Sequence, residues 1–319
     1  MGKLVDITTG PVRAVLGVLV RDKTTRKNII WATDTYAALG DGFQDRQQLT
    51  EALLLSHPDT IMPRIDKSRE AQAARTRKKA EVYTPVWLCN EINNFCDSEW
   101  FGRKNVFNTM DDQHGWEPVQ GKIDFPEGKT WQQYVDSRRL EITCGEAPFL
   151  VSRYDASNGE LIEPPLRRIG ILDRKLRIVN ENTGSYLDWL KWSVRAMEAS
   201  YGFEYQGDNL LIARANILLT YVDYYKERWG CVPDKNLLHR VATRIVWNIW
   251  QMDGLKDTVP LGRPFEEFHQ MDIYDFGISD RIERKEEQDA AYCRIFNWRS
   301  NCPVLYKKWK GGKSWGKII

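Results

Sequence analysis

The segment 202-GFEYQGDNLLIARANI-217 joins a short extended stretch, a turn and a long helix in direct succession. Extended structure is predicted over 201–205, which is rich in aromatic residues and contains Glu204 near its end. The helix that follows carries apolar residues on one side, namely Leu211, Ile212, Ala215, Leu218, Leu219 and Val222. A strand, a turn and a helix in this order form the repeating unit of an open α/β sheet.

Extended stretches and helices also alternate before and after this segment. An extended stretch, 138-RRLEIT-143, runs straight into a Cys-Gly turn. An amphipathic helix is predicted over 185–200, with Ser185 as its N-terminal cap and with one apolar face made of Leu187, Leu190, Val194 and Met197. The stretch 244-RIVWNIWQM-252 is predicted to be a buried strand. The sequence therefore predicts an open α/β sheet.

Three acidic residues stand at or near the ends of the predicted strands, and they are Glu141, Glu204 and Asp253. Open α/β sheets bind their ligands outside the carboxyl ends of the strands. These three positions are therefore candidate ligand-binding residues.

The composition is that of a folded protein. The chain has 319 residues, of which 42% are hydrophobic, and its 46 Lys and Arg residues against 44 Asp and Glu residues give a net charge of only +2. This balance excludes a uniformly basic DNA-coating protein, so any nucleic-acid surface must be local. No apolar stretch reaches the roughly 20 residues that span a bilayer, and no hydrophobic signal region opens the chain, so we expect a cytoplasmic protein.

The cysteines and histidines do not form a metal-binding pattern. Six Cys residues contain no CxxC pair, and the four His residues are scattered along the chain. We therefore expect reduced thiols and no metal site.

Residues 1–80 are predicted to form a mostly helical N-terminal region, which includes 46-RQQLTEALLL-55. A basic run follows within it, made of Lys67, Arg69, Arg75, Arg77, Lys78 and Lys79. This run is either a solvated helix face or an arm that contacts DNA phosphates. The next helix is predicted to start at Thr84-Pro85, with Thr84 as its cap and with Leu88, Ile92 and Phe95 on one face.

Residues 81–319 are predicted to form one α/β domain with insertions at about 100–137 and 152–184. The second insertion contains 165-PLRRIGILDRKLRIV-179, whose cations are Arg167, Arg168, Arg174, Lys175 and Arg177. This segment is either a surface elaboration or a contact to DNA phosphates. The tail 306-YKKWKGGKSWGKII-319 mixes cations with aromatic residues, which indicates either a nucleic-acid contact or a solvated terminus.

Four segments, in their order, resemble the adenine-N6 DNA methyltransferases, and most closely the modification subunits of restriction-modification systems. These segments are 81-EVYTPVWLCNEINN-94, 141-EITCGEAPFL-150, 202-GFEYQGDNLLIARANI-217 and 251-QMDGL-255. In the family they correspond to a Tyr-Thr-Pro element, a glycine-rich loop, an acidic strand end followed by an A-R-x-N helix, and a second acidic turn. The chain departs from the family pattern at Ala147 and Pro148 in the loop, and at Gln206-Gly207, where Asn-Pro is usual.

The resemblance implies a Rossmann-like sheet that binds S-adenosyl-L-methionine. It implies cofactor contacts by Tyr83, Thr84, Pro85, Glu141, Cys144, Gly145, Glu204 and Asp253. Glu204 would accept the ribose hydroxyls, and Asp253 would accept the adenine amino group. Tyr83, Thr84 and Pro85 would close the methionine pocket over the loop, where Gly145 allows close backbone approach.

The family's catalytic Asn-Pro-Pro-aromatic loop is not found in this sequence. That loop supplies hydrogen-bond acceptors for the target amino group and a ring that stacks on the flipped adenine. Two alternatives remain: the catalytic groups are Asn297 and Trp298, or the loop lies just beyond Ile319. The sequence therefore does not identify the catalytic residues.

Two functions follow from the resemblance. The first is a DNA adenine-N6 methyltransferase, or its cofactor-binding portion, that acts on double-stranded DNA in a restriction-modification or phage setting. The second is a catalytically silent subunit, or half of a split enzyme, that binds cofactor and DNA and needs a second subunit for the catalytic loop.

Overall fold

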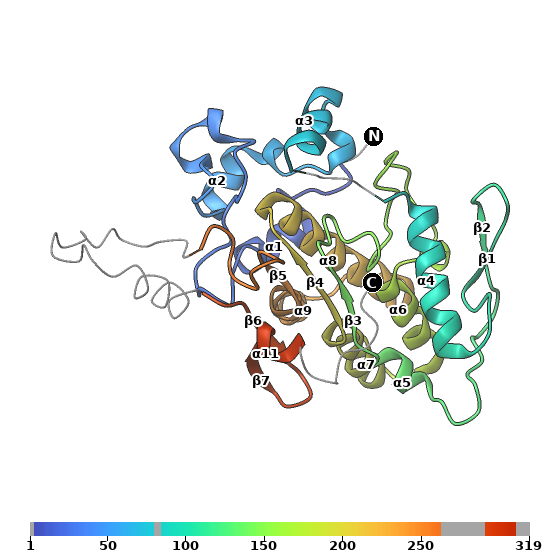
Figure 1. Ribbon diagram of the computed structural model, residues 1–319. Coiled ribbons are helices and arrows are strands. Elements are labelled where there is room, and N and C mark those ends of the chain that lie inside the picture. The colour runs from blue at the N-terminus through green and yellow to red at the C-terminus, as the bar shows by residue number, and fades with distance from the viewer. Residues whose placement is uncertain (1–2, 80–83, 263–290, 311–319) are drawn as a thin grey trace.

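A three-stranded parallel sheet organises the protein, with its strands in the order β3 (Arg139–Glu141), β4 (Ser200–Glu204) and β5 (Ile249–Gln251). Its coordinates come from a computed structural model that describes residues 3–79, 84–262 and 291–310 (Figure 1). Helices α6 (Ile171–Asn182) and α7 (Tyr186–Glu198) join β3 to β4. Helices α8 (Gly207–Trp229) and α9 (Lys235–Asn248) join β4 to β5. The chain is therefore of mixed α/β class.

The remaining elements surround this sheet. They are α1 (Gly10–Leu19), α2 (Glu51–Ser56), α3 (Arg69–Lys79), α4 (Val86–Phe101), β1 (Asn108–Met110), β2 (Trp116–Pro118), α5 (Trp131–Val135), β6 (Arg294–Asn297), β7 (Cys302–Leu305) and α11 (Tyr306–Lys310). Short 3₁₀ helices span Ala37–Leu39, Asp41–Phe43, Pro58–Thr60, Arg64–Asp66 and Pro165–Arg167.

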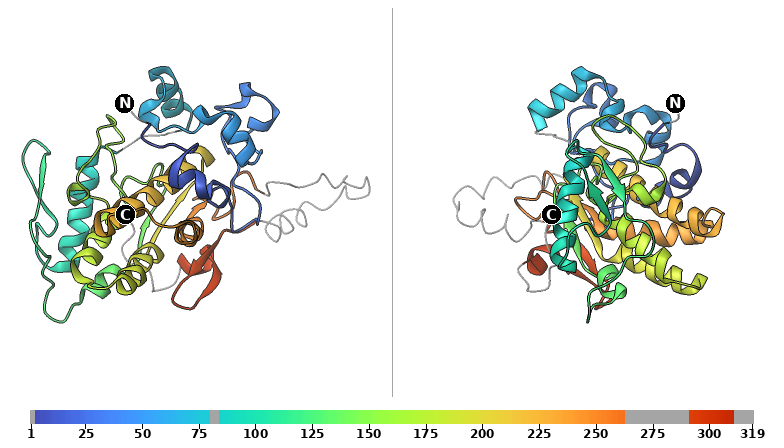
Figure 2. Two further views of the ribbon diagram at one scale, coloured as in Figure 1. Left: turned by 180° about the vertical axis from the view of Figure 1, so that it is seen from behind. Right: turned by 90° about the vertical axis from the view of Figure 1, so that its right-hand side faces the viewer.

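The two faces of the sheet are covered by different parts of the chain, as the views in Figure 2 show. Long helices cover one face, where Ile249 joins a large buried cluster with side chains of α1, α6, α8 and α9. The β6–β7 hairpin and α11 cover the other face, where Tyr201, Trp250, Ile295 and Tyr306 pack together. Residues on alternate sides of β5, Ile249 and Trp250, thus enter two separate apolar clusters.

Several expected elements are confirmed. Strand β4 occupies the predicted extended stretch, and α8 begins directly after it. Helix α7 begins after Ser185, whose side chain accepts a hydrogen bond from the backbone N–H of Asp188. The predicted apolar face of this helix is only partly right, because Leu187 is 74% exposed whereas Trp189 is buried.

The stretch 244–252 is not one strand, because 244–248 form the last turn of α9 and only 249–251 form β5. Apolar residues in a short run suit a buried helix as well as a buried strand. The predicted face of α4 is also wrong: Phe95 is 63% exposed, and the buried face carries Asn90, Asn93 and Asp97. These polar side chains are buried because partners elsewhere satisfy them; Arg174 binds both Asp97 and Asn90.

The N-terminal region shares its core with the α/β part. Helix α1 packs against α8 and α9, and its Leu16 and Leu19 are fully buried in the helical cluster. Much of 1–80 is loop and short helix, since 46–49 are not helical and α2 begins only after Thr50. Within the described residues, no helix is long and apolar enough to cross a membrane.

Candidate functional site

Glu204 lies at the carboxyl end of β4 and is 7% exposed. Its carboxylate accepts hydrogen bonds from the backbone N–H groups of Gly145 at 2.9 Å and Gln206 at 3.1 Å. Burial raises the pKa of Glu204 above its ordinary value, and these hydrogen bonds act in the opposite direction. The end of β4 is thereby joined to the loop that follows β3.

The loop after β3 crosses the end of β4. The N–H of Cys144 donates to the carbonyl of Phe203 at 2.8 Å, as if β3 continued beside β4, and the chain then turns at Gly145. Left-handed backbone is found at Thr143, Gly145 and Ala147, with φ values of 47°, 53° and 68°. Ala147 is not a glycine, yet its backbone adopts the left-handed conformation that favours glycine.

Glu141 holds the far end of this loop. Its two carboxylate oxygens accept hydrogen bonds from the backbone N–H groups of Phe149 at 3.3 Å and Leu150 at 3.0 Å. Burial raises the pKa of Glu141 to about 8, against the effect of these hydrogen bonds. The pKa of the Cys144 thiol is raised well above its ordinary value, mainly by burial and also by the charges of Glu141 and Glu204. Cys144 is therefore a buried neutral thiol under the loop.

The first turn of α4 lies beside the same loop. Cys89 donates from its Sγ to the carbonyl of Thr84, and its pKa is raised by burial and then by the nearby charge of Glu141. Thr84 is not the cap of this helix, because Pro85 is the residue before Val86 and no side chain caps the helix. Thr84 and Pro85 are thus near the predicted site, whereas Tyr83 lies outside the described residues.

Asp253 follows β5 but uses its carboxylate within its own turn. Its Oδ1 accepts hydrogen bonds from the backbone N–H groups of Leu255 at 3.0 Å and Lys256 at 3.2 Å. The same residue pairs through its backbone with Thr258. Asp253 therefore has a turn-stabilising role in this structure, and its expected contact to a cofactor remains a prediction.

A contact that the sequence did not reveal covers the carboxyl end of β5. The amide of Gln251 donates to the carbonyl of Ile30 at 2.8 Å and accepts from the N–H of Ile30 at 2.9 Å. Next to it, the N–H of Gly207 donates to the carbonyl of Trp31 at 2.9 Å. The N-terminal region therefore lies over one side of the candidate site, a contact between residues about 180 to 220 positions apart that local sequence patterns do not report.

Part of the basic run is structural rather than exposed. Arg75 and Lys67 lie 3.0 and 3.2 Å from the carboxylate of Asp208, in the first turn of α8, and the Arg75 side chain is only 2% exposed. Burial would raise the pKa of Asp208, but Lys67 and Arg75 lower it below its ordinary value. Arg69 and Arg77 are exposed on α3, which fits either a solvated face or a contact to DNA phosphates. The side chains of Lys78 and Lys79 lie outside the described residues.

Most of the basic segment 165–179 is not a surface insertion, and of its five predicted cations only Arg167 is exposed. It supplies α6, a crossover helix of the sheet, and Arg168, Arg174, Lys175 and Arg177 are all buried. The Nζ of Lys175 donates to the carbonyls of Ser137 at 2.6 Å and Ala199 at 3.0 Å, and burial lowers its pKa well below the ordinary value. These four cations therefore donate hydrogen bonds inside the protein and are not exposed to DNA.

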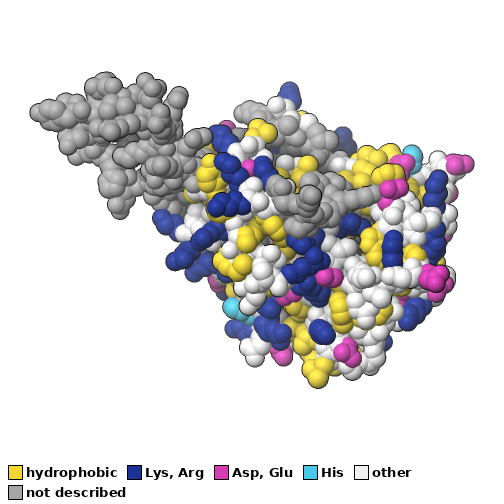
Figure 3. Space-filling model, turned by 60° about the horizontal axis from the view of Figure 1, so that its bottom comes forward, with side chains coloured by type: hydrophobic (Ala, Val, Ile, Leu, Met, Phe, Trp, Pro, Cys, Tyr) yellow, Lys and Arg dark blue, Asp and Glu magenta, His cyan; other side chains and the backbone are white. Residues whose placement is uncertain are grey.

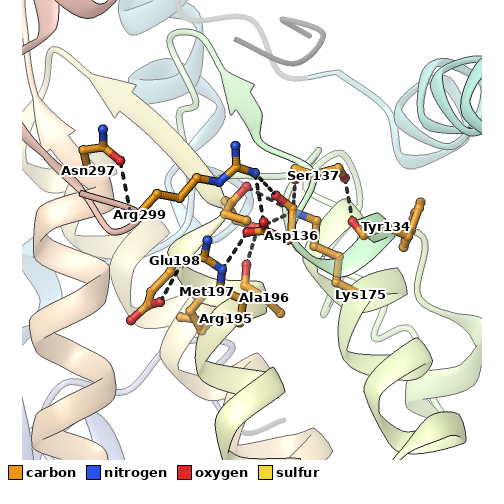
Figure 4. Close-up of polar contacts among 12 residues, drawn as sticks. Tyr134, Asp136, Ser137, Lys175, Arg195, Ala196, Met197, Glu198, Asn297 and Arg299 are labelled. Atoms are coloured by element: carbon orange, nitrogen blue, oxygen red, sulfur yellow. Dashed lines mark hydrogen bonds and ion pairs between the residues drawn. The ribbon is translucent and has the colours of Figure 1, made fainter. Parts of the chain in front are cut away.

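Asn297 and Trp298 lie at the opposite end of the strands from Glu204. The Oδ1 of Asn297 accepts from the N–H of Arg299 at 3.1 Å, as Figure 4 shows. The indole N–H of Trp298 donates to the side chain of Asn248, directly before β5, at 2.7 Å. Arg299 binds Asp136, which precedes β3. The side chains of Asn297 and Trp298 thus already have hydrogen-bond partners at the amino ends of the strands. We therefore assign these two residues no catalytic role.

Within the described ranges, no cluster of His, Cys, Asp and Glu could hold a metal ion. A surface hollow of about 490 Å³ lies along α7, where Leu190, Trp192 and Arg240 line it, and it is not at the carboxyl ends of the strands. Comparisons with protein-family models, with curated proteins and with solved structures found no match.

Proposed function

We propose that this protein binds S-adenosyl-L-methionine at the carboxyl ends of β3, β4 and β5, as an adenine-N6 DNA methyltransferase or as its cofactor-binding portion. One observation carries the proposal: the Glu204 carboxylate, at the end of the central strand, lies 2.9 Å from the backbone N–H of Gly145 in the loop after β3. The resemblance assigns these two residues to the cofactor, and they stand side by side.

The chemistry of these groups fits the proposed ligand. A buried carboxylate at a strand end can accept two ribose hydroxyls, and a glycine loop next to it allows the cofactor to approach the backbone. The parallel order β3, β4, β5 supports the proposal because it places the three predicted acidic positions along one edge of the sheet. When bound, S-adenosyl-L-methionine would supply the methyl group, and Glu204 would orient it through the ribose.

The cofactor proposal predicts that Glu204→Gln weakens S-adenosyl-L-methionine binding by about tenfold or more, because a neutral amide accepts fewer hydrogen bonds from the ribose. Isothermal titration calorimetry measures this, and far-UV circular dichroism verifies the fold. Glu117→Gln is the matched control, because Glu117 is exposed on β2. Equal affinities of the wild type and Glu204→Gln, or no binding by the wild type, would overturn the proposed site.

A silent or split methyltransferase is the second candidate, and the missing Asn-Pro-Pro loop favours it. Transfer of a tritiated methyl group to double-stranded DNA separates the two candidates. Cofactor binding with transfer indicates that the chain carries its own catalytic groups. Cofactor binding without transfer indicates that a second subunit supplies them.

A further inference from the structure

Positive charge is concentrated in two segments that the cofactor proposal does not use. Residues 21–28 and 291–310 together carry nine Lys and Arg side chains and a single carboxylate, Asp22, although the whole chain has a net charge of +2. Asp22 is 4% exposed and accepts hydrogen bonds from Thr24 and Thr25. Two of the nine cations, Arg299 and Lys310, form ion pairs with Asp136 and Asp257 outside these segments. The surface of the two segments, here called the basic surface, therefore has a local excess of positive charge that comes from the other cations.

The two segments are adjacent in space. The backbone N–H of Arg294, at the start of β6, donates to the hydroxyl of Thr24 at 3.0 Å. Figure 3 shows Lys and Arg side chains gathered on the face of the molecule that includes the hairpin. Arg21, Arg26, Arg294, Arg299 and Lys308 are exposed. The cations thus belong to one continuous surface rather than to separate loops.

Aromatic rings hold some of these cations in place. Trp247, Phe296 and Trp298 form a row, with ring centroids 5.2 Å and 4.3 Å apart. Lys23 of the basic surface lies over Trp247 at one end of the row, and Arg244 of α9, outside the two segments, lies over Trp298 at the other. Neighbouring cations and rings already contact these ring faces, so the row orients charge rather than offering a platform for unpaired bases.

We propose that the basic surface binds the phosphate backbone of duplex nucleic acid without reading its sequence. Ordered cations that are spaced along a surface neutralise phosphates and release counterions, which gives affinity independent of base identity. Burial and the nearby charges of Arg214 and Arg21 lower the pKa of Lys23, which is consistent with an excess of positive charge.

An anionic membrane is the competing partner for such a surface, and the exposed apolar residues argue against it. Membrane-surface binding also uses large apolar side chains that enter the lipid. The most exposed large hydrophobic residues of the described structure, such as Leu187 and Leu255, lie outside both segments. The surface offers charge without an inserting group, which suits a phosphate backbone.

The test compares two variants with the same change in charge. The first replaces Arg21, Arg294 and Lys308 by Gln, and all three side chains are exposed. The control replaces Lys104, Lys122 and Lys235 by Gln, which are exposed on other parts of the protein. Fluorescence anisotropy measures binding of each protein to a labelled 30-base-pair duplex of mixed sequence, across a series of salt concentrations and without cofactor.

We expect the first variant to bind the duplex about tenfold or more weakly and to lower the salt slope by up to about 2.7, while the control variant stays close to wild type. Equal losses in both variants would show a mere net-charge effect and overturn the proposal. Binding to phosphatidylserine vesicles with no binding to the duplex would overturn it as well.

This inference stands apart from the cofactor site. The duplex assay contains no cofactor, and Arg21, Arg294 and Lys308 are exposed residues outside the proposed cofactor site. A protein that fails to bind S-adenosyl-L-methionine but shows the expected duplex binding would disprove the proposed function alone.

Discussion

Glu141 and Glu204 lie at adjacent strand ends, where each binds backbone N–H groups and each has a raised pKa. Both carboxyl groups are buried, and both accept hydrogen bonds from backbone N–H groups of the loop between Gly145 and Leu150 or of the turn after β4. These hydrogen bonds favour the ionised form, whereas burial disfavours it and dominates the pKa of both groups. The same carboxyl groups therefore shape the loop, and their burial opposes their ionisation.

The Glu141 pKa predicts a specific dependence of stability on pH. Its folded-state pKa is about 8, compared with an ordinary value of 4.5, so the folded protein holds a proton that the unfolded chain has released between these values. The contribution of Glu141 to stability is full below about pH 4.5 and is lost as pH rises towards 8. We expect the free energy of unfolding to fall by about 1 kcal/mol or more over this pH range because of Glu141, and Glu141→Gln should remove that fall.

Urea unfolding at pH 5.5 and pH 9 measures this effect as the difference in the free energy of unfolding between the two pH values. Any effect of the substitution on the free energy of unfolding that does not depend on pH disappears from this difference. Glu117→Gln, on the exposed side of β2, should keep the wild-type difference. An unchanged difference in Glu141→Gln would contradict the raised pKa.

At the scale of elements, apolar patterns predicted where β4 and α8 lie, whereas charge patterns did not predict which cations are buried. Strand β4 and helix α8 follow from their apolar residues because burial of those residues is what stabilises them. The cations of α3 and α6 carry no such signal: Arg75 and Arg174 are buried against Asp208 and Asp97, which lie far away in the sequence. A basic helix looks the same in a sequence whether its partner is solvent, DNA or a buried carboxylate.

Helix α3 provides a direct test of this distinction. Arg75→Met should lower the free energy of unfolding by about 3 kcal/mol, because it leaves the buried charge of Asp208 with one cation fewer. Arg77→Met, on the exposed side of the same helix, should change it by less than about 0.5 kcal/mol. Urea denaturation followed by circular dichroism gives both values, and equal effects would refute a structural role for Arg75.

At the scale of the whole molecule, the N-terminal region and the α/β part share a core through α1 and also approach each other closely at one backbone position. A Cβ added to Gly207 would lie 2.0 Å from the carbonyl oxygen of Ile30, so only glycine permits this approach. The same glycine donates its N–H to Trp31, while Gln251 binds Ile30 from the next strand. A glycine is therefore required at position 207 because the N-terminal region occupies the space that a side chain would take.

Gly207→Ala should therefore loosen the N-terminal region and lower the free energy of unfolding by about 2 kcal/mol. Gly184→Ala is the matched control, because an added Cβ there meets no atom within 4 Å. Urea unfolding measures stability, and limited proteolysis between residues 20 and 50 reports the loosening. Identical behaviour of the two variants would show that the contact at Gly207 is unimportant.

The sequence by itself determined the α/β class, the position of β4, the start of α7 at Ser185 and the acidic residues at the strand ends. These features depend on short-range periodicity and capping, which are local properties of the chain. Only the tertiary structure decided that Arg75 and Lys175 are buried, that Asp253 stabilises its own turn, and that the N-terminal region lies over β5. These features depend on partners that are distant in the sequence, because a charge or a backbone polar group can be buried only where another group forms a hydrogen bond or an ion pair with it.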